Sequence, residues 1–224
     1  MKDEKICVVV SAMYGDTNKL LDLIKNISGN IPNSPECDRV LSSGENISAG
    51  LLALSLESIG VKSRSMCAYD LPIYTTGDPT NSKIHSIDTS IVKKLISEGV
   101  IPIITGFQGI DMESKSITTI GRGGSDTTAV AISHFINAKR CDIYTDIDGV
   151  YEVDPHVNFN AKRINSLKYD EMIKLTEKGA KVLQRDSVIF AMEKEVPVRV
   201  LSTFYNIPGT DIKNNGDKLN EAKF

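Results

Sequence analysis

The chain of 224 residues lacks any apolar run long enough to cross a membrane. Its longest apolar stretches, such as ICVVV and VIPII, have the length of strands, whereas a bilayer span needs about 20 apolar residues. The charged start MKDEKICVVVSAM carries too short an apolar segment for a signal peptide. We therefore expect a cytoplasmic protein that has no membrane partner.

Long runs of lysine or arginine are also missing. The formal net charge is −3 and the sequence pI is about 5.7. A protein that binds nucleic acid usually shows a basic patch or stripe in its sequence. The charge balance therefore argues against a nucleic-acid partner.

Several short motifs of metal and nucleotide sites are absent. The four cysteines form no CxxC pair and the three histidines form no HExxH, which argues against a structural zinc site. No Walker A loop and no GxGxxG fingerprint occurs, and DIDGVYEVD fails the spacing of a calcium loop. No metal ligand set of the protein's own is expected.

Strand-like and helix-like segments alternate along the whole chain. The composition, with 41% hydrophobic and 25% charged residues, is that of a globular protein. Alternation of this kind is typical of an α/β fold with a mainly parallel sheet. The pattern predicts strands over 5–10, 63–68, 100–105, 141–146 and 196–202, helices over 16–27, 38–60, 88–99, 169–179 and 181–194, and a turn-rich segment over 72–85.

The segment GRGGSD, residues 121–126, precedes an apolar helix. Ser125 is a good helix N-cap and Asp126 suits the first turn. Helix N-termini bind anions, glycines allow close approach to the backbone, and Arg122 offers a planar fork for a carboxylate. The alternative is a strand-to-helix turn whose glycines serve geometry only, and the hexapeptide leaves both interpretations open.

Four ordered motifs carry a resemblance to a known family. SSGENISAG (42–50), TIGRGGSDTTA (119–129), YTDIDGVYEVDP (144–155) and GAKVL (179–183) resemble the catalytic domain of aspartate kinase, a branch of the amino-acid kinases. The resemblance implies a three-layer α/β/α sandwich with a mainly parallel central sheet over 1–210, followed by a polar tail over 211–224. It also implies transfer of phosphate from Mg-ATP to the side-chain carboxylate of L-aspartate, on the route to lysine, threonine and methionine.

The resemblance also implies roles for individual residues. Glu45 would hold the substrate ammonium and Arg122 its α-carboxylate, with Gly123, Gly124, Ser125 and Asp126 completing the aspartate site. Asp126 and Lys181 would be the catalytic residues, and Lys181 would contact the ATP phosphates. The nucleotide site would consist of Thr145, Asp146, Tyr151, His156, Lys181 and Val182, with ATP and Mg²⁺ as the cofactors.

The chain departs from the family pattern at several places. The family opens with a Lys-Phe-Gly-Gly strand, which has no counterpart here, and this chain starts at what resembles the second strand. His156 stands where an arginine is common, LQRD (183–186) replaces a His-Pro pair, and ACT domains are absent. We therefore expect this chain alone to retain nucleotide binding but to phosphorylate aspartate little or not at all.

Other functions stay open beside aspartate kinase. One is a catalytically silent remnant or subunit that binds nucleotide or amino acid. Another is a different amino-acid kinase, such as glutamate 5-kinase or acetylglutamate kinase, although Glu45 beside a free ammonium argues against an acylated substrate. The expected partner is L-aspartate, and a homodimer is compatible with the sequence.

Overall fold

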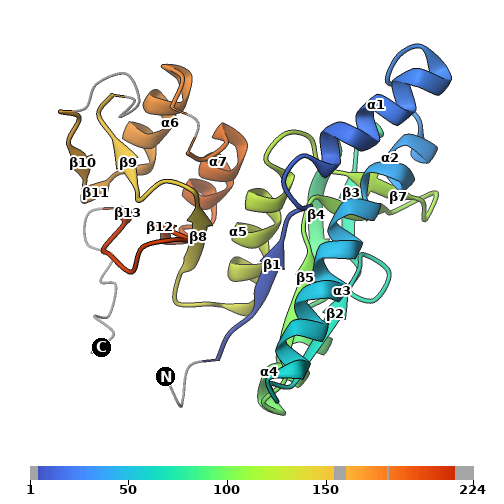
Figure 1. The fold of residues 1–224 in the computed structure, drawn as a ribbon, viewed down its shortest axis with the longest axis horizontal. Coiled ribbons are helices and arrows are strands. Elements are labelled where there is room, and N and C mark those ends of the chain that lie inside the picture. The colour runs from blue at the N-terminus through green and yellow to red at the C-terminus, as the bar shows by residue number, and fades with distance from the viewer. Residues whose placement is uncertain (1–4, 154–159, 181, 215–224) are drawn as a thin grey trace. The chain divides into compact units, whose positions relative to one another are not determined.

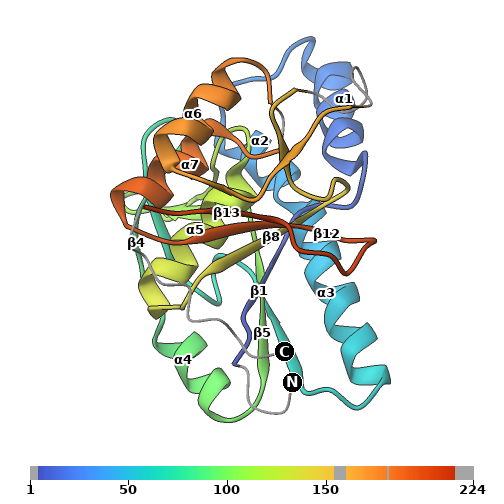
Figure 2. The same ribbon diagram turned by 90° about the vertical axis from the view of Figure 1, so that its left-hand side faces the viewer.

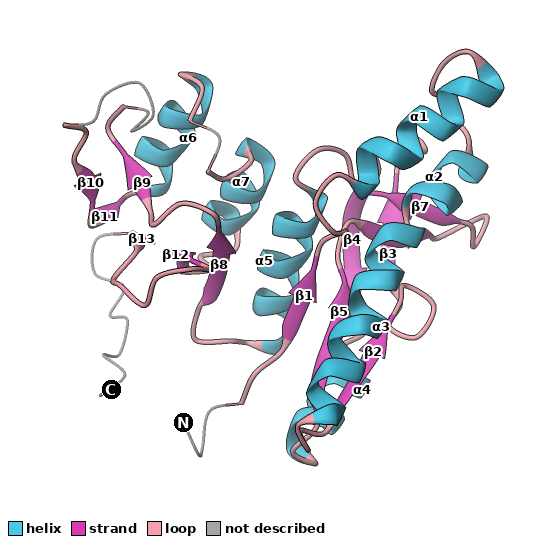
Figure 3. Ribbon diagram, viewed as in Figure 1, coloured by secondary structure: helices cyan, strands magenta, loops and turns pink. Residues whose placement is uncertain are grey.

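The computed structural model describes residues 5–153, 160–180 and 182–214. The chain divides into two compact units between Thr128 and Ala129, within helix α5 (Gly124–Ile136). Both units combine helices with strands (Figures 1 and 3), but strict alternation is not kept, because three helices follow β1 and four strands precede α6. None of the helices in these ranges is long and apolar enough to span a bilayer.

The first unit is built on a parallel sheet of three strands in the order β1-β5-β2. The strands are β1 (Val8–Val10), β5 (Ile101–Thr105) and β2 (Ser63–Met66). Val10 pairs with Thr105, so β1 and β5 end side by side at one edge of the sheet. Ligands of α/β sheets bind beyond such carboxyl ends.

Helices cover both faces of this sheet. In Figure 2, α3 (Ser43–Ser58) and α4 (Ser90–Ser97) lie on opposite sides of β5. Ala49 and Ala53 of α3 form a buried cluster with Ile103 of β5. Small side chains at this contact allow the helix to pack close to the strands, which fixes the N-terminus of α3 relative to the sheet.

A second, mixed sheet of the first unit has the order β4-β3-β6-β7. Its strands are β3 (Ile73–Thr76), β4 (Lys83–Ile87), β6 (Gln108–Asp111) and β7 (Ile117–Thr119). Residues 72–85, expected as a turn-rich excursion, therefore contain β3 and the start of β4. These two strands are short and the residues between them favour turns, so the sequence pattern did not predict them.

The prediction of a single helix over residues 38–60 is wrong. Two helices occur instead, α2 (Pro35–Leu41) and α3, with Ser42 between them. The Ser42 carbonyl accepts a hydrogen bond from Gln108 Nε2 at 3.1 Å. At the same place the Ser42 and Ser43 hydroxyls donate to the Arg39 and Val40 carbonyls at the end of α2, at 3.1 and 2.7 Å. The preceding helix, α1 (Asp16–Ser28), matches its expected range within one residue.

The second unit holds a sheet in the order β11-β13-β12-β8. Its strands are β8 (Cys141–Thr145), β12 (Val198–Ser202), β13 (Thr210–Ile212) and β11 (Ser166–Leu167), with β8 and β12 parallel. A separate antiparallel pair joins β9 (Val150–Tyr151) and β10 (Arg163–Ile164). The strand β13 extends two residues past the expected domain boundary at residue 210.

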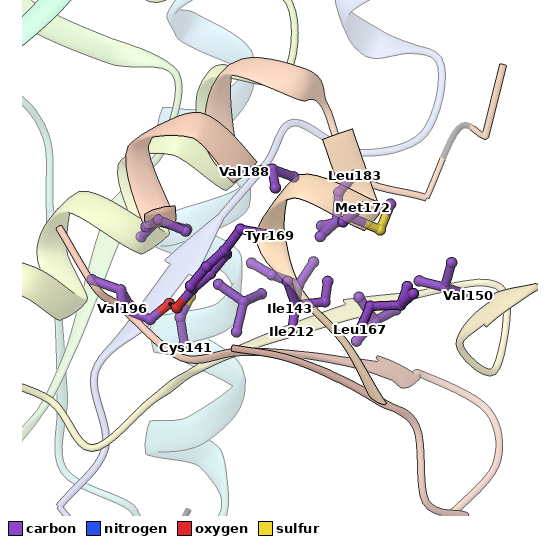
Figure 4. Close-up of a cluster of buried hydrophobic side chains, with 14 residues drawn as sticks. Cys141, Ile143, Val150, Leu167, Tyr169, Met172, Leu183, Val188, Val196 and Ile212 are labelled. Carbon is purple, nitrogen blue, oxygen red and sulfur yellow. Dashed lines mark hydrogen bonds between the residues drawn. The ribbon is translucent and has the colours of Figure 1, made fainter. Parts of the chain in front are cut away.

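One hydrophobic core stabilises the second unit. Helices α6 (Tyr169–Glu177) and α7 (Arg185–Glu193) contribute Tyr169, Met172 and Val188 to it, packed with side chains of the sheet (Figure 4). The Tyr169 hydroxyl donates to the Val196 carbonyl at 2.7 Å, which satisfies the polar tip of a buried ring.

Candidate functional site

Glu45 is a buried acid at the start of α3. Its side chain is 3% exposed, and its Oε1 accepts a hydrogen bond from the Ala12 N–H at 3.0 Å. Within the described part of the chain, Oε2 has no hydrogen-bond partner. A buried polar atom without a partner is costly, and in a site it points to a group that a ligand supplies. A donor brought by a ligand would satisfy this oxygen.

The environment of Glu45 is electrostatically unusual. Burial raises the pKa of its carboxyl to about 7, although the hydrogen bond from Ala12 acts in the opposite direction. A positive charge near the carboxyl would favour its ionised form. The site is therefore suited to an ammonium group, which brings both a charge and N–H donors.

Gly44 explains how Glu45 reaches the loop after β1. A Cβ atom at Gly44 would lie 2.8 Å from the Ala12 Cβ, a distance that side chains do not tolerate. Glycine thus allows α3 to approach the chain that carries the Ala12 N–H. At Gly50, farther along α3, an added Cβ would meet no described atom within 4 Å beyond the backbone of the helix itself and the neighbouring residues of the chain.

The glycines of GRGGSD pack closely against neighbouring loops. A Cβ at Gly121 would lie 2.7 Å from Asn81 Oδ1, and one at Gly124 would lie 2.7 Å from the Phe107 ring. Conversely, a Cβ at Gly106 would lie 2.8 Å from the Ser125 Cβ. Close packing alone is therefore enough to explain glycine at positions 121 and 124. This agrees with the interpretation of the motif as a turn whose glycines serve geometry.

The helix start differs from the expectation in one respect. Helix α5 begins at Gly124, so Ser125 lies in the first turn and is not the N-cap. Gly123 precedes the helix with a φ of 71°, and its carbonyl accepts from the Thr127 N–H at 3.1 Å. Glycine adopts the left-handed backbone conformation without steric cost, which explains why the helix is capped at Gly123, two residues before the expected Ser125. Asp126 is partly buried in the first turn.

Arg122 is exposed to solvent. It forms no ion pair with any residue that the structure describes. A guanidinium without an acidic partner can donate two parallel hydrogen bonds to a ligand carboxylate.

Two contacts bring the residues that are predicted to bind aspartate to one edge of the parallel sheet. Glu45 is bonded to Ala12, just beyond β1, and Ser125 packs on Gly106, just beyond β5. The Gly106 N–H donates to the Val10 carbonyl at 2.9 Å, which ties the two strand ends together. Glu45 and the GRGGSD segment, which carries Arg122, therefore both lie at the edge of the first unit where the parallel strands have their carboxyl ends.

The predicted nucleotide residues lie in the second unit. Thr145 is the last residue of β8, and its hydroxyl donates to Asp146 Oδ1 at 3.0 Å. The Tyr151 hydroxyl donates to Asp148 Oδ1 at 2.6 Å, and this hydrogen bond, with burial, raises the pKa of Tyr151. Arg163 Nη1 lies 3.7 Å from Asp148 Oδ2. These bonds fix the loop after β8.

Gly149 is required in that loop. It has a φ of 144°, and a Cβ there would lie 2.7 Å from Thr210 Oγ1. Val182 packs against the hydrophobic core of the unit. Lys181 and His156 lie outside the described residues, so of the predicted nucleotide-binding residues the structure describes Thr145, Asp146, Tyr151 and Val182.

Several residues that shape the candidate sites could not be predicted from the sequence. Ala12 contributes only a backbone N–H, which any residue could supply, and Gly106 matters through the space it leaves. Asp148 had a detectable signal, because it lies in the motif YTDIDGVYEVDP, but its role as the partner of Tyr151 and Arg163 depends on the fold.

The sequence profile of the "Amino acid kinase family" matches residues 1–202. The chain belongs to the amino acid kinase family. Its α/β fold, predicted from the sequence, is confirmed by a solved aspartate kinase from Synechocystis with a TM-score of 0.81 and 36% identity, which covers 93% of this chain and 34% of that one.

Relatives named aspartokinase are similar over almost the whole chain. The one from Rickettsia felis is 44% identical over 221 residues, covering 97% of this chain and 55% of its own length. The one from Geobacillus stearothermophilus is 44% identical over 212 residues, covering 95% and 52%. The structure of E. coli aspartokinase III in complex with aspartate and ADP gives a TM-score of 0.80 at 26% identity, covering 93% and 58%. The chain thus spans about half the length of these curated relatives.

Proposed function

We propose that the chain provides the substrate-binding residues of an aspartate kinase, which transfers the γ-phosphate of ATP to the side-chain carboxylate of L-aspartate. The product is 4-phospho-L-aspartate, a precursor for lysine, threonine and methionine. The observation that carries the proposal is the buried Glu45 carboxyl, whose Oε2 lacks a partner within the described residues at the edge that also holds Arg122. One acid and one base are what an amino acid needs to be oriented.

In this proposal the first unit binds the amino acid. Glu45 accepts hydrogen bonds from the ammonium, and Arg122 donates to the α-carboxylate. Gly123, just before α5, and Gly124 and Ser125, in its first turn, line the site at the helix start, where the helix dipole favours negative charge. The side-chain carboxylate is left unpaired by these contacts and is the nucleophile.

The second unit binds ATP through Thr145, Asp146, Tyr151, His156, Lys181 and Val182. An oxygen of the aspartate side chain attacks the γ-phosphorus, the bond from this phosphorus to the β-γ bridging oxygen breaks, and ADP leaves. Phosphoryl transfer depends mainly on positioning, the role we give to Asp126, and on charge neutralisation, the role we give to Lys181. The described residues contain no cluster of acids, histidines or cysteines that fits a metal ion. Mg²⁺ would therefore enter with the ATP phosphates, whose charge it neutralises.

The comparisons support this choice of substrates. Relatives at 44% identity are named aspartokinase, and E. coli aspartokinase III was solved with aspartate and ADP. Among the alternatives, an acylated amino acid has no ammonium to offer Glu45, and its acyl group would meet a buried carboxyl. Glutamate 5-kinase and a silent remnant remain as distinct outcomes of the test.

The test is a hydroxylamine trap for the acyl phosphate, made with the full natural gene product. We expect ATP-dependent hydroxamate with L-aspartate, and at most a small fraction of that rate with L-glutamate or N-acetyl-L-glutamate. A higher rate with glutamate would overturn the substrate assignment. Calorimetric binding of aspartate and ATP without any hydroxamate would identify the silent remnant instead.

We also propose that two copies associate through the outer face of α3. Ile47, Leu51 and Leu54 are 51%, 51% and 63% exposed, and their spacing places them on one stripe of the helix. The charged residues of α3 are Glu45, which is buried, and Glu57. An uncharged stripe can meet the same stripe of a second copy about a two-fold axis without like-charge repulsion.

Sedimentation velocity tests this association. We expect the natural protein to be a dimer, and Leu51→Glu to give a monomer. Leu23→Glu, on the 56% exposed Leu23 of α1, is the matched control and should stay dimeric. A monomeric natural protein, or an unchanged dimer in Leu51→Glu, would contradict the proposal.

A further inference from the structure

Among the described acids of the first unit, Asp38 of α2 is the most completely buried, with an exposed fraction of 0%. It forms no ion pair with any residue in the described ranges. A buried carboxylate without a cation is expensive unless several donors satisfy it. The donors that hold Asp38 therefore indicate what the residue is for.

Two threonines distant in sequence donate to Asp38. The Thr80 N–H is shared between Oδ1 at 2.9 Å and Oδ2 at 3.1 Å. The Thr119 hydroxyl donates to Oδ1 at 2.5 Å. Thr80 has a φ of 65°, which is uncommon for a β-branched residue, so its turn is held in a strained conformation. Asp38 thus joins a strained turn to the end of β7.

Both contacts converge on the segment that carries Arg122. Thr119 is the last residue of β7, and Arg122 follows three residues later. The Ser82 N–H of the turn donates to the Thr119 carbonyl at 3.0 Å. The side chain of Asn81, in the same turn, lies against Gly121. The turn therefore supports the segment on one side, and Asp38 supports both the turn and the strand end.

We propose that Asp38 is a positioning residue that, through Thr80 and Thr119, fixes the segment from which Arg122 extends toward the aspartate carboxylate. Asp38 itself contacts no substrate in this arrangement. The consequence for aspartate binding rests on the proposed function, whereas the order of the segment does not. Two readouts are therefore needed, one for each statement.

The test uses the full natural gene product with Asp38→Asn and Thr119→Val. Asparagine keeps the shape of Asp38 but loses its charge, and valine keeps the shape of Thr119 but loses its hydroxyl. Hydrogen bonds to charged groups are among the stronger ones, so we expect the KM for aspartate to rise about 10-fold. The KM for ATP should stay within about two-fold, since the contacts of Asp38 lie in the first unit. Thr119→Ser restores the hydroxyl and should restore the KM for aspartate.

Thr118→Val is the matched control. Thr118 neighbours Thr119 on β7 and is also buried, but its hydroxyl is bonded to Thr75 at 2.6 Å and not to Asp38. This variant should lose stability to a similar extent while its KM for aspartate is unchanged. Equal rises of that KM in Thr118→Val and Thr119→Val would show a merely structural role and overturn the proposal.

Amide hydrogen exchange gives the readout that needs no substrate. Peptides covering residues 117–125 should exchange faster in Asp38→Asn and Thr119→Val than in the natural protein and in Thr118→Val. Unchanged exchange in these peptides would overturn the positioning role. Faster exchange together with an unchanged aspartate KM would support the positioning role and would instead remove Arg122 from the aspartate site.

Discussion

At the scale of single residues, Glu45 combines two properties that a substrate ammonium requires. Its carboxyl has one oxygen bonded to Ala12 and the other without a partner among the described residues. Its pKa is raised from 4.5 to about 7 by burial, so near neutral pH the free protein holds a mixture of protonated and ionised Glu45. In the proposed site a bound ammonium would favour the ionised form, which would couple aspartate binding to loss of a proton.

We predict that aspartate binding near pH 7 releases about half a proton per site. Calorimetry in two buffers of different ionisation enthalpy measures this number directly. Glu45→Gln has no proton to release and should bind aspartate more weakly. The same proton release in both proteins would remove Glu45 from the ammonium site.

The raised pKa of Glu45 also sets a pH dependence of stability. The folded state binds the Glu45 proton more tightly than the unfolded state, whose pKa stays near 4.5. The free energy of unfolding therefore falls as the pH rises from about 4.5 to about 7, by an amount on the order of 1–3 kcal/mol. Glu45→Gln should lose this fall, as measured by urea denaturation at several pH values. A parallel pH profile in both proteins would contradict it.

At the scale of elements, close approach between loops and helices is achieved by glycine. Gly106, beyond β5, packs on Ser125 at the start of α5, and a Cβ would lie 2.9 Å from the Ser125 Cα. We predict that Gly106→Ala destabilises the protein by about 1–3 kcal/mol, because backbone has to move. Gly50→Ala, inside α3 with open space around it, should stabilise it by about 1 kcal/mol through helix propensity.

Urea denaturation of the two alanine variants provides the comparison. The same substitution in the same unit should have opposite signs, which controls for the general effect of an added methyl group. Destabilisation by both variants, or by neither, would mean that the packing of Gly106 on Ser125 is not tight.

The elements also show how far the sequence predicts the structure. Helix α1 and strand β8 follow from periodicity and β-branched runs, since their determinants are local. The break at Ser42 does not follow from periodicity: the Ser42 and Ser43 hydroxyls bond there to the last carbonyls of α2, and Gln108 reaches the Ser42 carbonyl from a strand that is distant in sequence. Glu45 and Arg122 were predicted as site residues from the motifs. Asp38 was not, since a helical acid usually lies in solvent and only the fold brings Thr80 and Thr119 to it.

At the scale of the whole molecule, the predicted ligand-binding residues are divided between the two units. Glu45 and Arg122 belong to the first unit, and Thr145 and Tyr151 belong to the second. The central claim is that the first unit recognises aspartate and the second recognises ATP. Single substitutions should then affect one substrate at a time.

Steady-state kinetics of Arg122→Ala and Lys181→Met in the full natural gene product test this claim most directly. Loss of a charge-assisted hydrogen bond, about 1.5–3 kcal/mol, predicts an aspartate KM raised about 10- to 150-fold in Arg122→Ala, with the ATP KM nearly unchanged. Lys181→Met should raise the ATP KM, lower turnover and leave the aspartate KM nearly unchanged. Equal weakening of both substrates by Arg122→Ala, or an unchanged ATP KM and turnover in Lys181→Met, would contradict the account.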